Sequence, residues 1–325
     1  MRKIVIFNVG GASCAFANIN GTKILLDVGK SDNFNPITDF LEPVFDKNQY
    51  DKNENGRYSI NQLIVSHPHR DHISAIPNFN DSFYPDLVTC PNDNDHSGNN
   101  EPVNKRDAIN WDFFDLKDNE PLSTLRKMME DRSLPLRPSI PPSSTDEQHI
   151  YWLHPKDVEE DPALTEESYP NNISLVNLLI VNGHHILFPG DIQKEGMKKL
   201  LETHLDLKIK LSKHRLCILI APHHGLKSSF STELFNTIKD HRTRCLNVIS
   251  EKPNNPDEAR DVDSRYASSD YCDGDNNLES SNGPGKNYQR KTFQGHICID
   301  FANGSRPDIE IITDTNILID RFTEY

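Results

Sequence analysis

The chain has 325 residues and a mass of 37.1 kDa, which allows two domains of average size or one large domain. Its 35 lysines and arginines stand against 49 aspartates and glutamates, giving a net charge of −14. A chain with this net charge is not expected to attract polyanions such as nucleic acids by its overall electrostatic field. Binding of nucleic acid would require a local basic patch or a bound metal ion. The hydrophobic fraction of 35% and mean hydropathy of −0.65 predict one core with long polar excursions.

The sequence predicts no membrane segment and no exported form. No apolar run approaches the ~20 residues of a membrane span, and the apolar stretch at the N-terminus is too short for a signal peptide. Six scattered cysteines without C-x-x-C spacing indicate a reduced protein and argue against a disulfide scaffold or a thiolate zinc site. We therefore expect a cytoplasmic protein.

Apolar runs and turn residues divide the first half of the chain into short elements. We expect strands over 4–8, 14–19 and 23–27, a helix over 36–47 and a strand over 59–65. The Asn20-Gly21 pair predicts a hairpin turn between the second and third strands. Residues 78–147 are rich in Asn, Asp and Pro and predict an irregular insertion, with a helix over 122–131.

Regular elements return after the insertion. We expect strands over 150–153, 174–181, 185–188, 216–221 and 245–250, and helices over 193–204 and 231–239. The segment 253–287 is rich in Asp, Asn, Ser and Gly and predicts a flexible loop. Strands over 295–301 and 308–312 close the chain.

The motif His67-x-His69-x-Asp71-His72 directly follows an apolar strand. Buried imidazoles and carboxylates require partners, and this mixture of ligand types suits zinc, iron or manganese. Asp191 and the pair His223-His224 likewise follow apolar strands. Ligand sites of α/β proteins collect at strand carboxyl ends, so the three clusters predict one metal site.

The order of these motifs resembles that of the metallo-β-lactamase-fold hydrolases. Further stretches are similar to the hydrolase domain of the ComEC competence family and its soluble relatives, over about residues 3 to 250 and again near 293 to 301. These stretches are Asn8-Val9-Gly10-Gly11-Ala12-Ser13, Asn171-Asn172-Ile173-Ser174-Leu175-Val176, Leu187-Phe188-Pro189-Gly190-Asp191-Ile192 and Ala221-Pro222-His223-His224-Gly225-Leu226-Lys227-Ser228-Ser229.

The resemblance implies a four-layer αββα sandwich formed by residues 1–325 as a single domain. It implies two divalent ions, zinc or manganese, held at one edge between the sheets. His67 and His69 would bind the first ion, Asp71, His72 and His223 the second, and Asp191 both. Asp27 would orient a ligand histidine, a hydroxide between the ions would attack the substrate, and Asp71 would position the water or accept its proton.

The chain departs from the family pattern at several positions. Asn171 and Asn172 stand where many relatives place a third histidine, so one ion is expected to be weakly held, with Asn172 or water completing its ligands. A histidine that relatives tend to carry after the strand over 245–250 is missing, and His224 or His296 is expected to substitute. Lys227 and Ser228 are candidates for contact with a substrate phosphate.

The expected function is a metal-dependent phosphodiesterase or nuclease that acts on nucleic acid or a nucleotide. Two alternatives stay open: a lactone, thioester or β-lactam hydrolase of the same fold, and a non-catalytic metal-binding regulatory protein. The net charge favours a small nucleotide, or a protein partner that supplies a basic surface. Residues 194–215 are the best local basic stretch. The sequence does not determine the oligomeric state.

Overall fold

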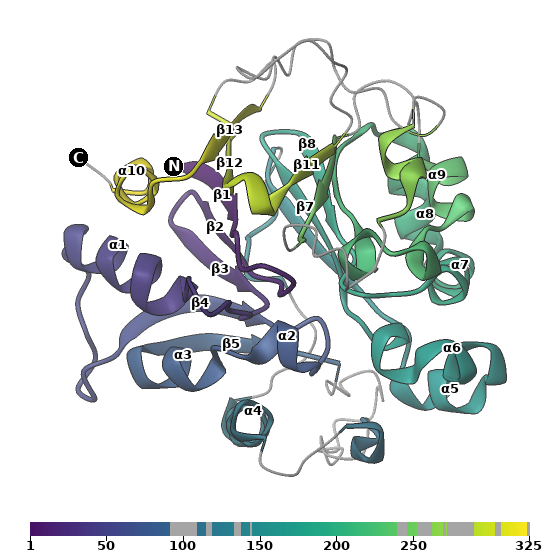
Figure 1. Ribbon diagram of the computed structural model, residues 1–325, viewed down its shortest axis with the longest axis horizontal. Coiled ribbons are helices and arrows are strands. Elements are labelled where there is room, and N and C mark those ends of the chain that lie inside the picture. Colours follow the sequence, from purple (N-terminus) through teal and green to yellow (C-terminus); the bar gives the residue numbers. More distant parts are fainter. Residues whose placement is uncertain are drawn as a thin grey trace.

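The computed structural model describes residues 1–91, 109–114, 119–132, 138–143, 145–238, 246–251, 262–268, 271, 289–302 and 307–323. These residues form two mixed β-sheets that face each other, with helices on their outer sides (Figure 1). The architecture is the α/β arrangement that the sequence predicted.

The first sheet has seven strands in the order β13-β12-β1-β2-β3-β4-β5. Its strands are β1 (Arg2–Ile6), β2 (Ala15–Ile19), β3 (Thr22–Leu26), β4 (Tyr58–Ile64), β5 (Phe83–Thr89), β12 (His296–Asp300) and β13 (Asp308–Ile312). β3, β4 and β5 run parallel, whereas the other neighbours are antiparallel.

The second sheet has six strands in the order β11-β10-β9-β8-β7-β6. They are β6 (Glu147–Tyr151), β7 (Val176–Val181), β8 (His184–Phe188), β9 (Leu216–Ile220), β10 (Leu246–Ile249) and β11 (Gln289–Lys291). β8, β9, β10 and β11 run parallel.

Helices cover the outer face of each sheet (Figure 1). Beside the first sheet lie η1 (Ile37–Leu41), α1 (Glu42–Lys47), α2 (Arg70–Ile73), α3 (Ile76–Ser82), α4 (Glu120–Arg132) and α10 (Thr315–Arg321). The second sheet is accompanied by α5 (Pro155–Glu160), α6 (Pro162–Asn172), α7 (Lys194–Thr203), α8 (Leu205–Lys213) and α9 (Thr232–Thr237). The short helical turns are η3 (Trp111–Phe113), η4 (Pro222–Gly225), η5 (Lys227–Ser229), η6 (Ser264–Ala267) and η7 (Thr292–Gln294).

Both faces of the central strands are buried. Along β1, Ile4 and Ile6 enter the apolar cluster between the sheets, whereas Val5 enters the cluster beneath the outer helices. This alternation follows from the two-residue period of a strand. Full burial on both faces explains why the strand segments read as continuous apolar runs.

A buried carboxylate ties the two sheets together at the edge away from the strand carboxyl ends. Asp146, just before β6, accepts hydrogen bonds from Arg2 of β1 at 2.9 Å and from Asn20 Nδ2 at 2.9 Å. It also accepts one from the backbone N–H of Asn182, in the β7–β8 turn, at 2.8 Å. Burial raises the pKa of Asp146, but the hydrogen bonds from Arg2 and Asn182 outweigh it and the net pKa is lowered.

Most predicted elements are confirmed within a few residues, including the Asn20-Gly21 hairpin, the helix over 122–131 and the strand over 308–312. One prediction was wrong in part, because β5 (Phe83–Thr89) lies in the range 78–147 that was expected to be irregular. The expectation rested on the Asn, Asp and Pro content of this range, which includes Pro85, but β5 is the edge strand of its sheet, where proline is tolerated. Most of the predicted loop 253–287 lies outside the described residues.

Candidate metal centre

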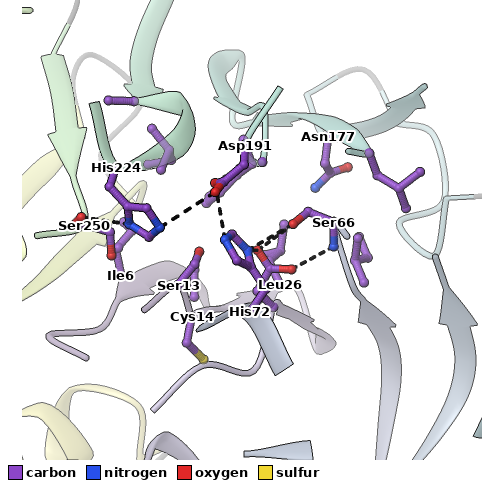
Figure 2. Close-up of a pocket in the computed structure, with 18 residues that line it drawn as sticks. Ile6, Ser13, Cys14, Leu26, Ser66, His72, Asn177, Asp191, His224 and Ser250 are labelled. Atoms are coloured by element: carbon purple, nitrogen blue, oxygen red, sulfur yellow. Dashed lines mark hydrogen bonds and ion pairs between the residues drawn. The ribbon is translucent and has the colours of Figure 1, made fainter. Parts of the chain in front are cut away.

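The predicted ligands lie together at one edge of the two sheets. β3 and β4 are parallel, and so are β8 and β9, so within each sheet their carboxyl ends point the same way. Asp27 follows β3, the histidine motif follows β4, Asp191 follows β8 and the histidine pair follows β9. His72, Asp191 and His224 line a small cavity of about 40 Å³. Figure 2 shows these three side chains directed toward one another.

The histidine motif wraps from the end of β4 into α2. His67 and His72 are buried, and Nε2 of His67 lies 2.9 Å from Nδ1 of His69. His69 is the residue before α2, and the backbone N–H of His72 donates to its carbonyl oxygen at 2.9 Å. The tight turn therefore brings all four motif side chains toward one space.

Asp27 holds this turn in place. Its carboxylate accepts hydrogen bonds from the backbone N–H of Ser66 at 2.7 Å and from the Ser66 hydroxyl at 2.9 Å, and it lies 2.8 Å from His72 Nδ1. A carboxylate on Nδ1 leaves Nε2 of His72 to face the cluster. Asp27 thus lies against a predicted ligand histidine, where it could orient the ring, and that orienting role stays a prediction.

Asp191 lies at the centre of the site. Its carboxylate oxygens lie 3.3 Å from His72 Nε2, 4.0 Å from His67 Nε2 and 3.8 Å from both His223 Nε2 and His224 Nε2. Gly190 allows this placement because its φ is +59°, and a Cβ there would come within 2.9 Å of neighbouring serine side chains. Any residue other than glycine at position 190 would place a Cβ atom against these serines and would have to displace them.

The histidine pair adopts a backbone conformation that is rare for residues other than glycine. His223 and His224 have φ values of 49° and 56°, in the left-handed region. Both rings turn toward Asp191, and His224 Nε2 also lies 3.1 Å from Asp71 Oδ2. Consecutive left-handed residues carry strain, and such strain concentrates at functional sites.

The structure differs from the sequence prediction in how it groups this pair. We predicted His223 with Asp71 and His72, and His224 as a substitute for a missing histidine. In the described residues, the compact set of potential ligands is Asp71, His72, Asp191 and His224, whose ligand atoms all lie within 4.8 Å of one another.

The electrostatics keep the carboxylates of this set charged. Burial alone would raise the pKa of Asp191, but His72 and His224 outweigh it, and the net pKa lies well below its ordinary value. The pKa of Asp71 is also lowered, because the hydrogen bond from His224 and the charge of His72 outweigh burial. Both side chains therefore present anionic oxygens.

The imidazoles divide into two classes. Burial, together with His72 and His69, lowers the pKa of His67 well below its ordinary value. Burial would also lower the pKa of His72, but Asp191 and Asp27 raise it well above its ordinary value. Burial therefore favours the neutral form of His67, which can offer a nitrogen lone pair, whereas the two carboxylates favour the protonated form of His72, whose proton a bound cation would replace.

The donor set fits a divalent transition-metal ion. Nε2 of His72 is fully buried and makes no hydrogen bond within the described part of the chain, although it faces the carboxylates. Such an orphaned nitrogen calls for a partner. Imidazole and carboxylate ligands at about 2.0–2.2 Å from one ion lie about 3–4 Å apart, close to the spacing found here.

The remaining predicted residues lie around the cluster or apart from it. Ser228 Oγ is 3.5 Å from His223 Nδ1, while Lys227 is exposed. The amide of Asn172 bonds to the carbonyl oxygen of Leu164 at 2.8 Å and to the backbone N–H of Gln193 at 3.1 Å. It therefore anchors α6 to the start of α7 and does not take the place of a ligand.

His296 has a separate environment. Its Nδ1 accepts a hydrogen bond from the backbone N–H of Asn8 at 3.1 Å, and its ring packs against Phe34. Burial lowers its pKa to about 4, so it is a neutral, satisfied core residue.

The family follows from the sequence comparison. The model of the metallo-beta-lactamase superfamily matches residues 7–207. The chain belongs to this superfamily. No curated protein matches it in sequence.

Solved structures also align with this superfamily member, at low sequence identity. The fold protein YhfI from Bacillus subtilis is 12% identical, with a TM-score of 0.33 over 68% of this chain and 71% of its own. Human tRNase Z, short form, is 14% identical, with a TM-score of 0.38 over 80% and 97%. Unliganded yeast PDE1 is 12% identical, with a TM-score of 0.42 over 81% and 91%.

Two serines that contact the candidate ligands were not predicted as site residues. Ser66 Oγ lies 2.9 Å from Asp27 and 3.2 Å from Nδ1 of both His67 and His72. Ser174 Oγ lies 3.3 Å from His67 Nδ1 and accepts a hydrogen bond from the backbone N–H of Asp191 at 3.1 Å. The only signal in the sequence was their position, directly before the histidine motif and after the asparagine pair.

Proposed function

We propose that this protein is a metal-dependent phosphodiesterase with a dinuclear site. The observation that carries the proposal is the position of Asp191, whose carboxylate is within 4.0 Å of four imidazole Nε2 atoms from two separate loops. A single carboxylate shared by four imidazoles matches the ligands of two neighbouring ions better than those of one.

We assign the ligands to two groups. Asp71, His72 and His224 form the first group with Asp191, because they are the most compact set of potential ligands. This group corresponds to the ion that was numbered second in the sequence prediction. His67 and His69 form the second, with nitrogens 2.9 Å apart. We place His223 in the second group, because its Nε2 also faces Asp191 and it can supply the ligand that Asn172 does not.

When bound, divalent ions at this site would polarise a phosphoryl oxygen and lower the pKa of an attacking water. The chain supplies the remaining parts of the reaction. Asp71 is partly exposed and held anionic, so its carboxylate can accept a hydrogen bond from the attacking water and orient it. His224 is fixed by its Nδ1 contact with the Ser250 carbonyl oxygen at 3.0 Å, which keeps its Nε2 directed at Asp71.

Phosphodiester cleavage is favoured over the other hydrolyses by the pairing of ligand groups, because two ions stabilise both the attacking and the leaving oxygen of an in-line displacement. We also propose that the chain belongs to the ComEC-like branch, on the strength of the His223-His224-Gly225 and Asn171-Asn172 motifs. These stretches support the relationship by their order along the chain.

We further propose that residues 1–325 form one domain, since both sheets contribute ligands to one site. We also propose a cytoplasmic location, because the six cysteines are scattered along the sequence without the spacing of a disulfide framework. Among the described residues no helix has the length and apolar character that crossing a bilayer demands.

The test is hydrolysis of bis-p-nitrophenyl phosphate by protein reconstituted with manganese or zinc, with metal content measured in parallel. Asp191→Ala and Asp71→Ala are expected to lose at least about 100-fold in turnover, because each removes a proposed metal ligand and Asp71→Ala also removes the group that orients the water. Asp86→Ala, on the exposed side of β5, is the matched control and retains activity. Equal background turnover in all four proteins would overturn the proposal, and turnover confined to a lactone or thioester would support the other hydrolase class.

A further inference from the structure

A large cavity opens beside the metal centre and is not part of it. Its volume is about 750 Å³, and it lies between α2, α3, the segment 109–114 and the start of α4. Its size is within the range of roughly 300–1,000 Å³ of cavities that hold small molecules. The 40 Å³ cavity beneath His72 is a different space, between the sheets.

The cavity reaches the ligands through His69. The ring of His69 lines the cavity, and its Nδ1 lies 2.9 Å from Nε2 of His67. A substrate whose phosphate lies at the metal centre can therefore extend the rest of its structure into this space.

The cavity contains an aromatic surface that is held in place from behind. Phe113 is 41% exposed, and its ring stacks on Tyr169 with centroids 4.3 Å apart and planes 25° apart. Tyr169 is fully buried, and its hydroxyl accepts a hydrogen bond from the backbone N–H of Asn110 at 2.8 Å. The next residue, Phe114, is buried and packs against His69. One face of Phe113 is thus covered and braced, which leaves the exposed part of the ring for a ligand.

The charges around the cavity do not suit a long polyanion. Lys30 and Arg70 line it, but so do Asp81 and Glu120, so the formal charges of these four side chains cancel. Arg70 lies next to His69 in the chain, whereas Nζ of Lys30 donates to Asn78 Oδ1 at 3.0 Å. A nucleic-acid strand gains affinity by neutralising several phosphates, and this cavity offers it no net positive charge.

We propose that this cavity binds the nucleoside part of a small nucleotide phosphodiester, with the base stacked on Phe113. The inference deepens the proposed phosphodiesterase function and rests on it. An aromatic surface suits any base, because every base has a π face. The carboxylates of Asp81 and Glu120 are available as acceptors for base N–H groups. The net charge of −14 agrees with a small ligand.

The experiment measures binding of adenosine 5′-monophosphate and of inorganic phosphate to the manganese-loaded protein by calorimetry. The variants are Phe113→Ala, the conservative Phe113→Tyr and, as a matched control, Phe293→Ala, which removes an aromatic ring of similar exposure outside the cavity. Phe113→Ala is expected to weaken nucleotide binding about tenfold, the scale of one base stack, with phosphate binding unchanged. Phe113→Tyr and Phe293→Ala are expected to bind both like the wild type.

Two results would overturn the inference: equal affinity of the wild type for the nucleotide and for phosphate, or unchanged nucleotide binding by Phe113→Ala. Stronger binding of a single-stranded oligonucleotide than of the mononucleotide would also overturn it, in favour of a strand. Wild-type turnover of bis-p-nitrophenyl phosphate tests the proposed function by itself. If the wild type hydrolyses bis-p-nitrophenyl phosphate but binds the nucleotide no more tightly than phosphate, only the cavity assignment is refuted. If the wild type shows no turnover, the proposed function is refuted.

Discussion

Replacement of Asp27 by asparagine tests whether a side chain that is not itself a ligand controls metal binding. Asp27 has a φ of 55°, and asparagine tolerates the left-handed region better than most residues. Asparagine also has nearly the same shape. The substitution therefore keeps the backbone and the packing and changes mainly the charge and one acceptor.

The magnitude follows from the contacts of the carboxylate. Asp27 lies 2.8 Å from His72 Nδ1 and accepts from the Ser66 N–H at 2.7 Å and the Ser66 hydroxyl at 2.9 Å. An amide keeps one acceptor oxygen and places an N–H₂ group where another donor points. Loss of such an orienting partner lowers metal affinity about 10- to 100-fold, or about 1.4 to 2.8 kcal/mol.

The assay is competition between the protein and a chelating dye for manganese or zinc, with circular dichroism to show that each variant is folded. Asp86→Asn is the control, because Asp86 is an exposed carboxylate of the same sheet. A folded Asp27→Asn protein that binds metal as tightly as the control would refute the orienting role of Asp27. Loss of affinity only together with loss of the fold would show that Asp27 is structural.

Two further substitutions test how the fold supports the site. Asp146→Asn is expected to lower the free energy of unfolding by about 2 kcal/mol, because it weakens charged hydrogen bonds with Arg2. The folded-state pKa of Asp146 is lowered, so its contribution is present above the ordinary pKa and lost as pH falls through the lowered value. Urea unfolding should therefore show a smaller difference from wild type near pH 3 than at pH 7, and a constant difference would contradict this account. Gly190→Ala is expected to cost at least about 2 kcal/mol and to weaken metal binding, because strain at φ +59° adds to close contacts. The control Gly183→Ala has φ +79° with nothing within 4 Å, so similar losses in both would show that contacts at position 190 are unimportant.

The strands and the hairpin could be predicted because local signals agree with the tertiary structure. Both faces of the central strands are buried, so these segments are apolar throughout, and Asn20-Gly21 supplies the positive φ values that its turn requires. β5 was missed because Pro85 is a loop signal unless the strand is at a sheet edge, which only the assembled sheet decides. The helices α5 and α6 were missed because their prolines and charged residues resemble those of a loop.

By itself, the sequence determined the superfamily, the order of the strands that the candidate ligands follow, and which histidines and aspartates were candidates for the site. Those features depend on residue type and on position after an apolar strand, which are local. Only the tertiary structure decided that His224 joins Asp71, His72 and Asp191, because that depends on two left-handed residues turning both rings of the His223-His224 pair. It likewise decided that Asn172 and His296 are satisfied by other partners, since hydrogen bonds between segments far apart in the chain leave no pattern in the sequence.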